Sequence, residues 1–172
     1  MSKVHHFHKS LKVGDKGELI IFNMLEQSPN VNSIWDVSGI KKYQNVDVDA
    51  IVKMKNGSEL KIEVKTDTYT SGNIYYETIS ALETGSQGCF LKTEADYIFY
   101  YYINQEVLYI LEVDSYQKWF NEREDFFKEK GYQKQVKNSR WDGSEYTSIG
   151  YAYPVSILEN DKPRWMRKVY LN

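Results

Sequence analysis

Proline, cysteine and long apolar runs are all scarce in this chain. There are three prolines in 172 residues, and the single cysteine, Cys89, has no partner for an internal disulfide. A chain without disulfides suits a reducing compartment, so we expect a cytoplasmic location. No apolar run approaches the roughly 18–20 residues that span a bilayer, and the first ten residues lack the continuous apolar segment of a secretory signal. We therefore expect no membrane partner.

An excess of positive charge is missing as well. The formal net charge is −2, whereas domains that bind nucleic acid usually leave a basic footprint. This balance weighs against a nucleic-acid partner without excluding one, because an acidic catalytic site can lie inside a local basic rim. Glycine-rich phosphate loops and nucleophile–base signatures are also absent from the sequence. A small-molecule enzyme therefore has no support from these motifs.

What is present is ordinary globular composition, with 41 % hydrophobic and 27 % charged residues. No linker-like tract and no internal repeat divides the chain. We expect a single domain over residues 1–172, with a core at about 14–130 and a C-terminal tail, 131–172, packed on it.

Hydrophobic spacing and turn signals predict an α/β (α+β) mixed sheet flanked by helices. Asp15 would cap a helix that ends near Gln27, where Ser28-Pro29-Asn30 stops it. Asn56-Gly57 is the strongest turn signal and predicts a hairpin. Pro154 argues against a central strand near the C-terminus. The predicted strands are 33–37, 46–54, 59–66, 74–79, 97–103 and 107–113, with a second helix over 115–130 and one or two edge strands around 146–158.

Two neighbouring predicted strands carry acids toward one place. In the strand over residues 59–66, alternation puts Glu63 and Lys65 side by side, opposite an apolar face. The hairpin brings Asp49, on the preceding strand, within reach of Glu63. Paired carboxylates suit Mg²⁺ or Mn²⁺, and the neighbouring lysine can position or deprotonate a water or stabilise charge on phosphorus. The alternative is an exposed Glu63–Lys65 ion pair of little energetic consequence.

Glu18 would add a third acid from the first helix. One interpretation is structural, because the spacing from Asp15 to Glu18 resembles a capping box. However, Glu18 shares a helix face with Ile21, Phe22 and Leu25, and that apolar face should pack on the sheet. We therefore interpret Glu18 as a residue of the site.

The order of helix acid, strand aspartate, Asn-Gly hairpin and Glu-x-Lys strand resembles the PD-(D/E)XK nuclease superfamily, the restriction-endonuclease-like fold. The resemblance covers about residues 14–103 and is carried by Gly14–Glu18, Val46–Val52 and Lys61–Lys65. It implies an αβββαβ core, Mg²⁺ (or Mn²⁺) as cofactor, and attack of water on a DNA phosphodiester. It also implies the residue roles: metal binding by Asp49, Glu63 and Glu18, and catalysis with the help of Lys65.

Several assignments stay open within this resemblance. The proline of the motif's name is absent, and Asp47 competes with Asp49 as the metal ligand; the apolar continuation Ala50-Ile51-Val52 favours Asp49. A finer likeness to small phage-encoded members places Glu77 on the strand after the hairpin, either near the site or facing outward.

Aromatic and basic residues outside the motif are less informative. The tyrosines are candidates for stacking on unpaired bases, but core or interface positions are the commoner use of strand aromatics. The lysines near the hairpin are candidates for phosphate contacts, or for an ordinary solvated surface. These two groups are Tyr75, Tyr76 and Tyr100–Tyr102, and Lys41, Lys42, Lys53 and Lys55.

The sequence therefore predicts a metal-dependent endodeoxyribonuclease. Selectivity for a DNA structure, such as a branch, is compatible with this prediction. The alternative is a non-catalytic DNA-binding or assembly module that keeps the nuclease fold. A homo-oligomer is compatible with either, and the tyrosine-rich strands or the aromatic helix near Trp119 are its candidate interfaces.

Overall fold

The computed structural model describes the backbone of residues 5–140 and 142–171 and, within those ranges, the side chains from residue 13 onwards. The helices are α1 Phe7–Glu26, α2 Lys41–Gln44, α3 Cys89–Lys92, α4 Val113–Asn121, α5 Glu124–Glu129 and α6 Val155–Asp161, with a 3₁₀ helix η1 at Leu82–Thr84. The strands are β1 His5–His6, β2 Val31–Asp36, β3 Ala50–Met54, β4 Glu59–Asp67, β5 Asn73–Ala81, β6 Ser86–Gln87, β7 Tyr97–Tyr102, β8 Val107–Glu112, β9 Gln133–Ser139, β10 Glu145–Pro154 and β11 Met166–Tyr170.

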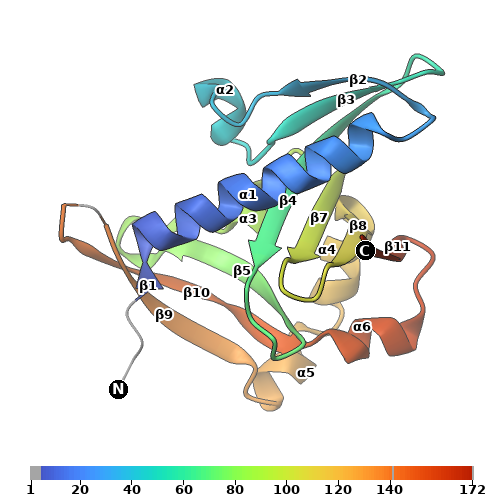
Figure 1. Ribbon diagram of the computed structural model, residues 1–172. Coiled ribbons are helices and arrows are strands. Elements are labelled where there is room, and N and C mark those ends of the chain that lie inside the picture. Colours follow the sequence, from blue (N-terminus) through green and yellow to red (C-terminus); the bar gives the residue numbers. More distant parts are fainter. Residues whose placement is uncertain (1–4, 141, 172) are drawn as a thin grey trace.

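The strands form two sheets (Figure 1). One has six strands in the order β11-β8-β7-β4-β3-β2, and the other has five in the order β1-β9-β10-β5-β6. In the six-stranded sheet β4 and β7 run parallel, and the other neighbours run antiparallel. The mixed α+β class is thus confirmed, with α1 and β2 to β4 followed by a crossover to β7. The crossover contains β5, β6 and two short helices, η1 and α3, in place of a long second helix.

Two apolar layers hold the sheets and helices together. One layer lies where α1 packs on the six-stranded sheet, and Ile21 of α1 is fully buried there. The other layer joins β7 and β8 to β5, β10, α4 and α5, and it is rich in tyrosine and phenylalanine. Tyr76 of β5 stacks on Phe120 of α4 with ring centroids 3.7 Å apart. The six-stranded sheet therefore has a packed layer on each face.

The first helix is longer than predicted. It begins at Phe7, so Asp15 lies inside α1 and does not cap it. No proline interrupts residues 7–26, and the helix passes through both Gly14 and Gly17. It ends at Glu26, before Ser28-Pro29-Asn30, as the turn signal predicted. The capping-box interpretation of Glu18 is therefore wrong.

The strand that precedes the hairpin is shorter than predicted. It starts at Ala50, and residues before it form a turn in which Asp47 has a positive φ of 45°. Aspartate tolerates this left-handed conformation better than most residues, because its short side chain bonds locally. Asp47 and Asp49 therefore do not share one strand face. The hairpin itself is confirmed: Gly57 has φ 88°, and the Met54 N–H donates to the Ser58 carbonyl at 2.8 Å.

Two predictions for the C-terminal half were wrong. The helix expected over 115–130 is broken between α4 and α5, where the Arg123 guanidinium bonds Asp161 at 2.9 Å and the Trp119 carbonyl at 3.2 Å. β10 was expected at an edge, yet it is the middle strand of its sheet. Pro154 is tolerated because it is the last residue of β10 and leads directly into α6. No helix in the described part of the chain is long and apolar enough to cross a membrane.

Candidate active site

β4 presents Glu63 and Lys65 on one face and its apolar residues on the other. Ile62 and Val64 belong to the layer under α1, as the alternation predicted. Only 3 % of Glu63 is exposed, and Lys65 Nζ lies 2.6 Å from Glu63 Oε1. The carboxylate of this ion pair is therefore buried, and the alternative of an exposed ion pair is wrong.

The charge of Glu63 is strongly disfavoured where it lies. Burial raises the pKa of Glu63 to about 8, and the charge of Asp49 adds to this effect, while Lys65 opposes it. One carboxylate oxygen, Oε2, is buried and has no hydrogen-bond partner. A buried polar atom without a partner is uncommon, because it loses its hydration and gains nothing in return.

Asp49 is locked against β4 by the backbone. Its own N–H donates to the Ile62 carbonyl at 2.8 Å, and its Oδ2 accepts a hydrogen bond from the Val64 N–H at 2.8 Å. These two bonds bracket Glu63, so the two carboxylates lie side by side. Burial raises the pKa of Asp49, the hydrogen bond from Val64 opposes this rise, and the charge of Glu18 adds to it.

Glu18 approaches the same place from α1. The preceding residue, Gly17, is buried against Thr66 of β4, and a Cβ on Gly17 would lie only 1.8 Å from Thr66 Oγ1. A glycine at this position lets α1 pack this closely on the end of β4. Glu18 is half-buried as a result; burial raises its pKa, and the charges of Asp15, Asp36 and Glu63 raise it further.

The three predicted metal ligands therefore influence one another without yet forming a cage. Asp49 and Glu63 interact directly. The charge of Glu18 raises the pKa of Asp49, and the charge of Glu63 raises the pKa of Glu18. However, within residues 13–140 and 142–171 no three His, Cys, Asp or Glu side chains converge closely enough to hold a metal ion. The structure brings Asp49, Glu63 and Lys65 together and leaves Glu18 at their rim.

Two more acids, Glu77 and Asp47, lie within the range of charge effects of Lys65. Glu77 of β5 is half-buried, and its Oε2 accepts a hydrogen bond from the Cys89 N–H at 3.4 Å. Asp47 pairs with Lys92 of α3 at 3.3 Å. Burial raises the pKa of Glu77, whereas the charge of Lys65 lowers it. Of the two positions left open for Glu77, the structure therefore has it facing the site.

Comparison with known proteins adds one structural likeness. No protein-family model and no curated protein sequence matches the chain. A solved structure that it resembles is that of a bacterial homing endonuclease, I-Ssp6803I, at 15 % identity and a TM-score of 0.45, covering 68 % of this chain and 70 % of that one. The functional argument therefore depends on the geometry of the site.

Sequence reasoning missed four residues that shape this site. Asp36 ends β2 and raises the pKa of Glu18, and Gly17 sets the approach of α1. Cys89 and Lys92, on α3, touch Glu77 and Asp47. None of the four lies at motif spacing from Asp49 or Glu63. Only Gly17 offered a signal, because a glycine inside a predicted helix needs a packing reason.

The aromatic predictions divide clearly. Tyr76 and Tyr100–Tyr102 are at most 4 % exposed, which confirms the core interpretation for these tyrosines. Trp119 is also buried, and its indole N–H donates to Asp161 Oδ2 at 2.7 Å. These side chains belong to the core of the chain, and the homo-oligomer itself stays a prediction.

The candidate phosphate-binding lysines lie on two elements, the β3–β4 hairpin and α2. Lys53 and Lys55 are toward the hairpin tip, and Lys53 pairs with Glu59 at 3.3 Å. Lys53 is four residues from Asp49, or roughly 13 Å along a strand. Lys41 and Lys42 are exposed on α2, just after Ser38, whose hydroxyl donates to Asp36 Oδ1 at 2.7 Å and opposes the rise in the pKa of Glu18. Lys41 and Lys42 are therefore the better placed pair.

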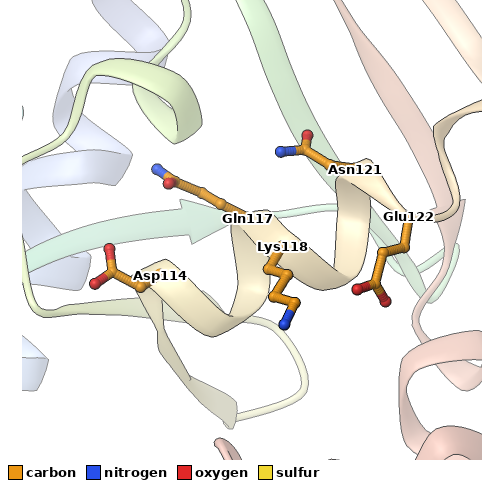
Figure 2. Close-up of a pocket in the computed structure, with 5 residues that line it drawn as sticks. All are labelled: Asp114, Gln117, Lys118, Asn121 and Glu122. Carbon is orange, nitrogen blue, oxygen red and sulfur yellow. The ribbon is translucent and has the colours of Figure 1, made fainter.

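A hollow on α4 takes no part in this arrangement (Figure 2). The residues that line it come from α4 and from Glu122, which directly follows it, and none belongs to the acidic group described above. These residues are Asp114, Gln117, Lys118, Asn121 and Glu122.

Proposed function

We propose that this chain is an endonuclease of the PD-(D/E)XK type that hydrolyses DNA with Mg²⁺ or Mn²⁺. The observation that carries the proposal is the buried carboxylate of Glu63, with Oε2 unpartnered, beside Asp49 and Lys65. Carboxylate oxygens are the preferred ligands of these cations, and a cation would satisfy the oxygen that the protein leaves without a partner. The chemistry of these donor atoms therefore fits the metal, although in the described residues no third carboxylate yet joins them.

The proposed roles follow from where each side chain is held. Asp49 and Glu63 would hold the cation, and Glu18 would complete its shell from α1. A bound divalent cation supplies neutralisation of the phosphate charge and polarises a phosphoryl oxygen. The backbone hydrogen bond from Val64 orients Asp49 in advance. Without a cation the three like charges repel one another, which keeps Glu18 apart from the other two acids. With a cation bound, rotation of the Glu18 side chain would bring the third carboxylate to it.

Lys65 is better suited to donate than to accept a proton. Burial works against its charge, but the Glu63 carboxylate, 2.6 Å away, helps to hold the pKa of Lys65 well above its usual value. An ammonium group here would hydrogen-bond to a non-bridging phosphate oxygen and stabilise the charge that develops during attack. The deprotonating role considered for this lysine is therefore the weaker one.

The test is cleavage of supercoiled and branched DNA in Mg²⁺ or Mn²⁺, with EDTA as the metal-free control. We expect Glu63→Gln, Asp49→Asn and Lys65→Ala each to lower cleavage by at least about 100-fold, because each removes a group that acts in the transition state. Glu59→Gln is the matched control: it changes the same residue type on the same strand, where Glu59 is exposed. Equal cleavage by wild type and Glu63→Gln would identify a contaminating nuclease and sink the mechanism.

One observation favours a non-catalytic DNA-binding module as the second candidate. No three potential ligands converge on an ion in the described part of the chain. This candidate predicts that the protein retains branched DNA on a gel at equal strength with and without divalent cations, and never cleaves it. Mg²⁺-dependent cleavage that Glu63→Gln abolishes would eliminate it.

A further inference from the structure

An exposed tryptophan lies on the same face of the sheet as the candidate site. Trp35 of β2 is 56 % exposed, although proteins usually bury most of a tryptophan side chain. β2 is an edge strand of the six-stranded sheet; Trp35 is the register partner of Ile51 on β3, and Ile51 is the partner of Lys61 on β4. Cross-strand partners share a face, and alternation along β4 puts Glu63 on the face of Lys61. Trp35 therefore shares that face with Glu63.

The backbone ties the segment after Trp35 to the acids. The Val37 N–H donates to the Asp49 carbonyl at 2.9 Å, and Val37 is fully buried in the aromatic layer of the sheet. Trp35 precedes Val37 by two positions. Two strand positions span about 7 Å and neighbouring strands are about 5 Å apart, which puts the backbones of Trp35 and Asp49 roughly 8 Å apart. The indole is therefore next to the place where a scissile phosphate would bind.

A second ring and two lysines border the indole. The Tyr43 ring of α2 meets Trp35 edge to face, with centroids 6.1 Å apart and planes at 72°. Lys42 Nζ lies 5.4 Å from the centroid of the Tyr43 ring, and Lys41 beside it is exposed. The Tyr43 carbonyl accepts a hydrogen bond from the Val48 N–H at 3.1 Å, which holds α2 on the turn before β3. We call Trp35, Tyr43, Lys41 and Lys42 the aromatic–basic patch.

This combination suits a DNA strand whose bases are unpaired. Aromatic side chains stack on exposed base faces, whereas an intact duplex keeps those faces inside its own stack. Lysines beside such a ring contact the phosphates of the same strand. Within the described part of the chain, neither Lys41 nor Lys42 forms an ion pair with an acid, so both are available to a polyanion.

We propose that the aromatic–basic patch is a platform for an unpaired base beside the scissile phosphate. The protein therefore takes DNA with single-stranded or branched regions in preference to intact duplex. This inference rests on the proposed function and adds a substrate class to it. It accounts for a tryptophan that is left more than half exposed on an edge strand, two positions from a fully buried valine.

The test is DNA binding by the full chain in EDTA, followed by fluorescence anisotropy. The probes are oligothymidine of about 16 nucleotides and a blunt duplex of the same length. We expect Trp35→Ala to weaken oligothymidine binding about tenfold and to change duplex binding by less than about twofold, because only the single strand loses a stacking surface. Trp35→Phe keeps an aromatic face and should stay within about threefold of wild type. Tyr170→Ala, at an exposed aromatic on the opposite edge strand β11, is the matched control and should change neither affinity.

Two results would overturn the platform through the variant. Equal weakening of both probes by Trp35→Ala would mean that the indole only holds α2 in place. A Trp35→Ala chain that binds both probes like wild type, but changes from a dimer to a monomer in analytical ultracentrifugation, would assign the patch to an interface between copies of the chain.

The wild-type chain separates this inference from the proposed function. Absence of oligothymidine binding together with cleavage of DNA in Mg²⁺ would overturn the platform and leave the nuclease standing. The expected dependence on Trp35 without cleavage in Mg²⁺ or Mn²⁺ would support the platform and overturn the nuclease. A chain that neither binds the single strand nor cleaves DNA would overturn both.

Discussion

At the scale of single residues, the carboxyl group of Glu63 is buried where its negative charge is disfavoured. Glu63 is 3 % exposed and its pKa is raised to about 8 by burial. A raised carboxyl pKa means that the folded protein takes up the proton more readily than the unfolded chain. At low pH, where Glu63 is protonated, it therefore does not reduce the free energy of unfolding. That free energy declines as the pH rises from 4.5, the ordinary pKa of a glutamate, toward about 8, the pKa of Glu63 in the fold.

This linkage predicts how Glu63→Gln changes the pH profile of stability. In EDTA, we expect the wild-type free energy of unfolding to fall between pH 5 and pH 8 by more than that of Glu63→Gln, which has no carboxyl group to ionise. Urea unfolding at the two pH values measures the difference. Asp49, Glu18 and Glu77 also have raised pKa values and act in the same direction, so only the gap between the two proteins reports on Glu63. Parallel profiles would contradict the burial argument.

The residues that sequence could locate are those whose relation is local. Glu63 and Lys65 are two positions apart on one strand, and strand alternation alone puts them on one face. Asp49 follows from the hairpin, because the Asn-Gly turn fixes the register. The positions of Glu77 and Asp47 depend on β5 crossing the site and on a left-handed backbone at Asp47, and neither can be derived from spacing.

At the scale of elements, the position of α1 depends on one glycine. An alanine inside a helix normally stabilises it relative to glycine by about 0.5–1 kcal/mol. At Gly17 the added Cβ meets Thr66, so we expect Gly17→Ala to destabilise the fold by about 1–3 kcal/mol and to lower cleavage by moving Glu18. Gly14→Ala, on the same helix with nothing within 4 Å of the added Cβ, should instead stabilise.

Urea unfolding of both variants decides this prediction. Thr66→Ala combined with Gly17→Ala should recover part of the loss, since it removes Oγ1 and Cγ2 from the contact. Equal effects of alanine at Gly14 and Gly17 would show that α1 does not need its close approach to β4.

The short helix α2 carries two exposed lysines, Lys41 and Lys42, in the segment between Asp36 and Asp49. If DNA lies across the site, Lys41→Ala and Lys42→Ala should each weaken binding and reduce the dependence of log affinity on log salt by about 0.9 per lost phosphate contact. Lys55→Ala, near the hairpin tip, is the control and should leave the slope unchanged. Binding to a catalytically inactive Glu63→Gln chain over a range of KCl concentrations gives the slopes. A reduced slope for Lys55→Ala alone would place the DNA elsewhere.

The boundaries of α1 and β3 were predicted poorly for a common reason. Each was set by a local signal, the Asp15 cap and the alternating valines, whereas packing decides where an element ends. α1 extends back to Phe7 although Asp15 offers a cap, and β3 gives up residues 46–49 to a turn that receives the Lys92 ion pair on Asp47. The hairpin and the end of α1 were correct because Asn-Gly and proline restrict the backbone itself.

At the scale of the whole molecule, the C-terminal residues complete both sheets. β10 pairs with β5 on one side and β9 on the other, and β11 closes the far edge of the six-stranded sheet on β8. We expect a chain that ends at residue 144 to lose cooperative unfolding, because Tyr76 and Phe120 then lose the cover of Tyr151. A chain that ends at residue 162 loses the edge strand β11 and Trp165, which packs on Tyr116 and Trp119, but it keeps β10 and should stay cooperative.

Thermal melts followed by near-UV circular dichroism compare the two truncations. A sharp melt from the chain that ends at residue 144 would show that the core of β5 and α4 stands without β10.

The pairing of β5 with β10 also has a cost in time. Tyr76 and Tyr151 are register partners, so the partner of β5 is synthesised about 75 residues after it. At roughly 5–20 residues per second, a ribosome takes about 4–15 s to supply that partner. During this interval the strand that carries Glu77 has an open edge, which is where a nascent chain pairs wrongly or is held by a chaperone. β5, which carries Glu77, is therefore the last strand near the proposed site to gain its pairing partner.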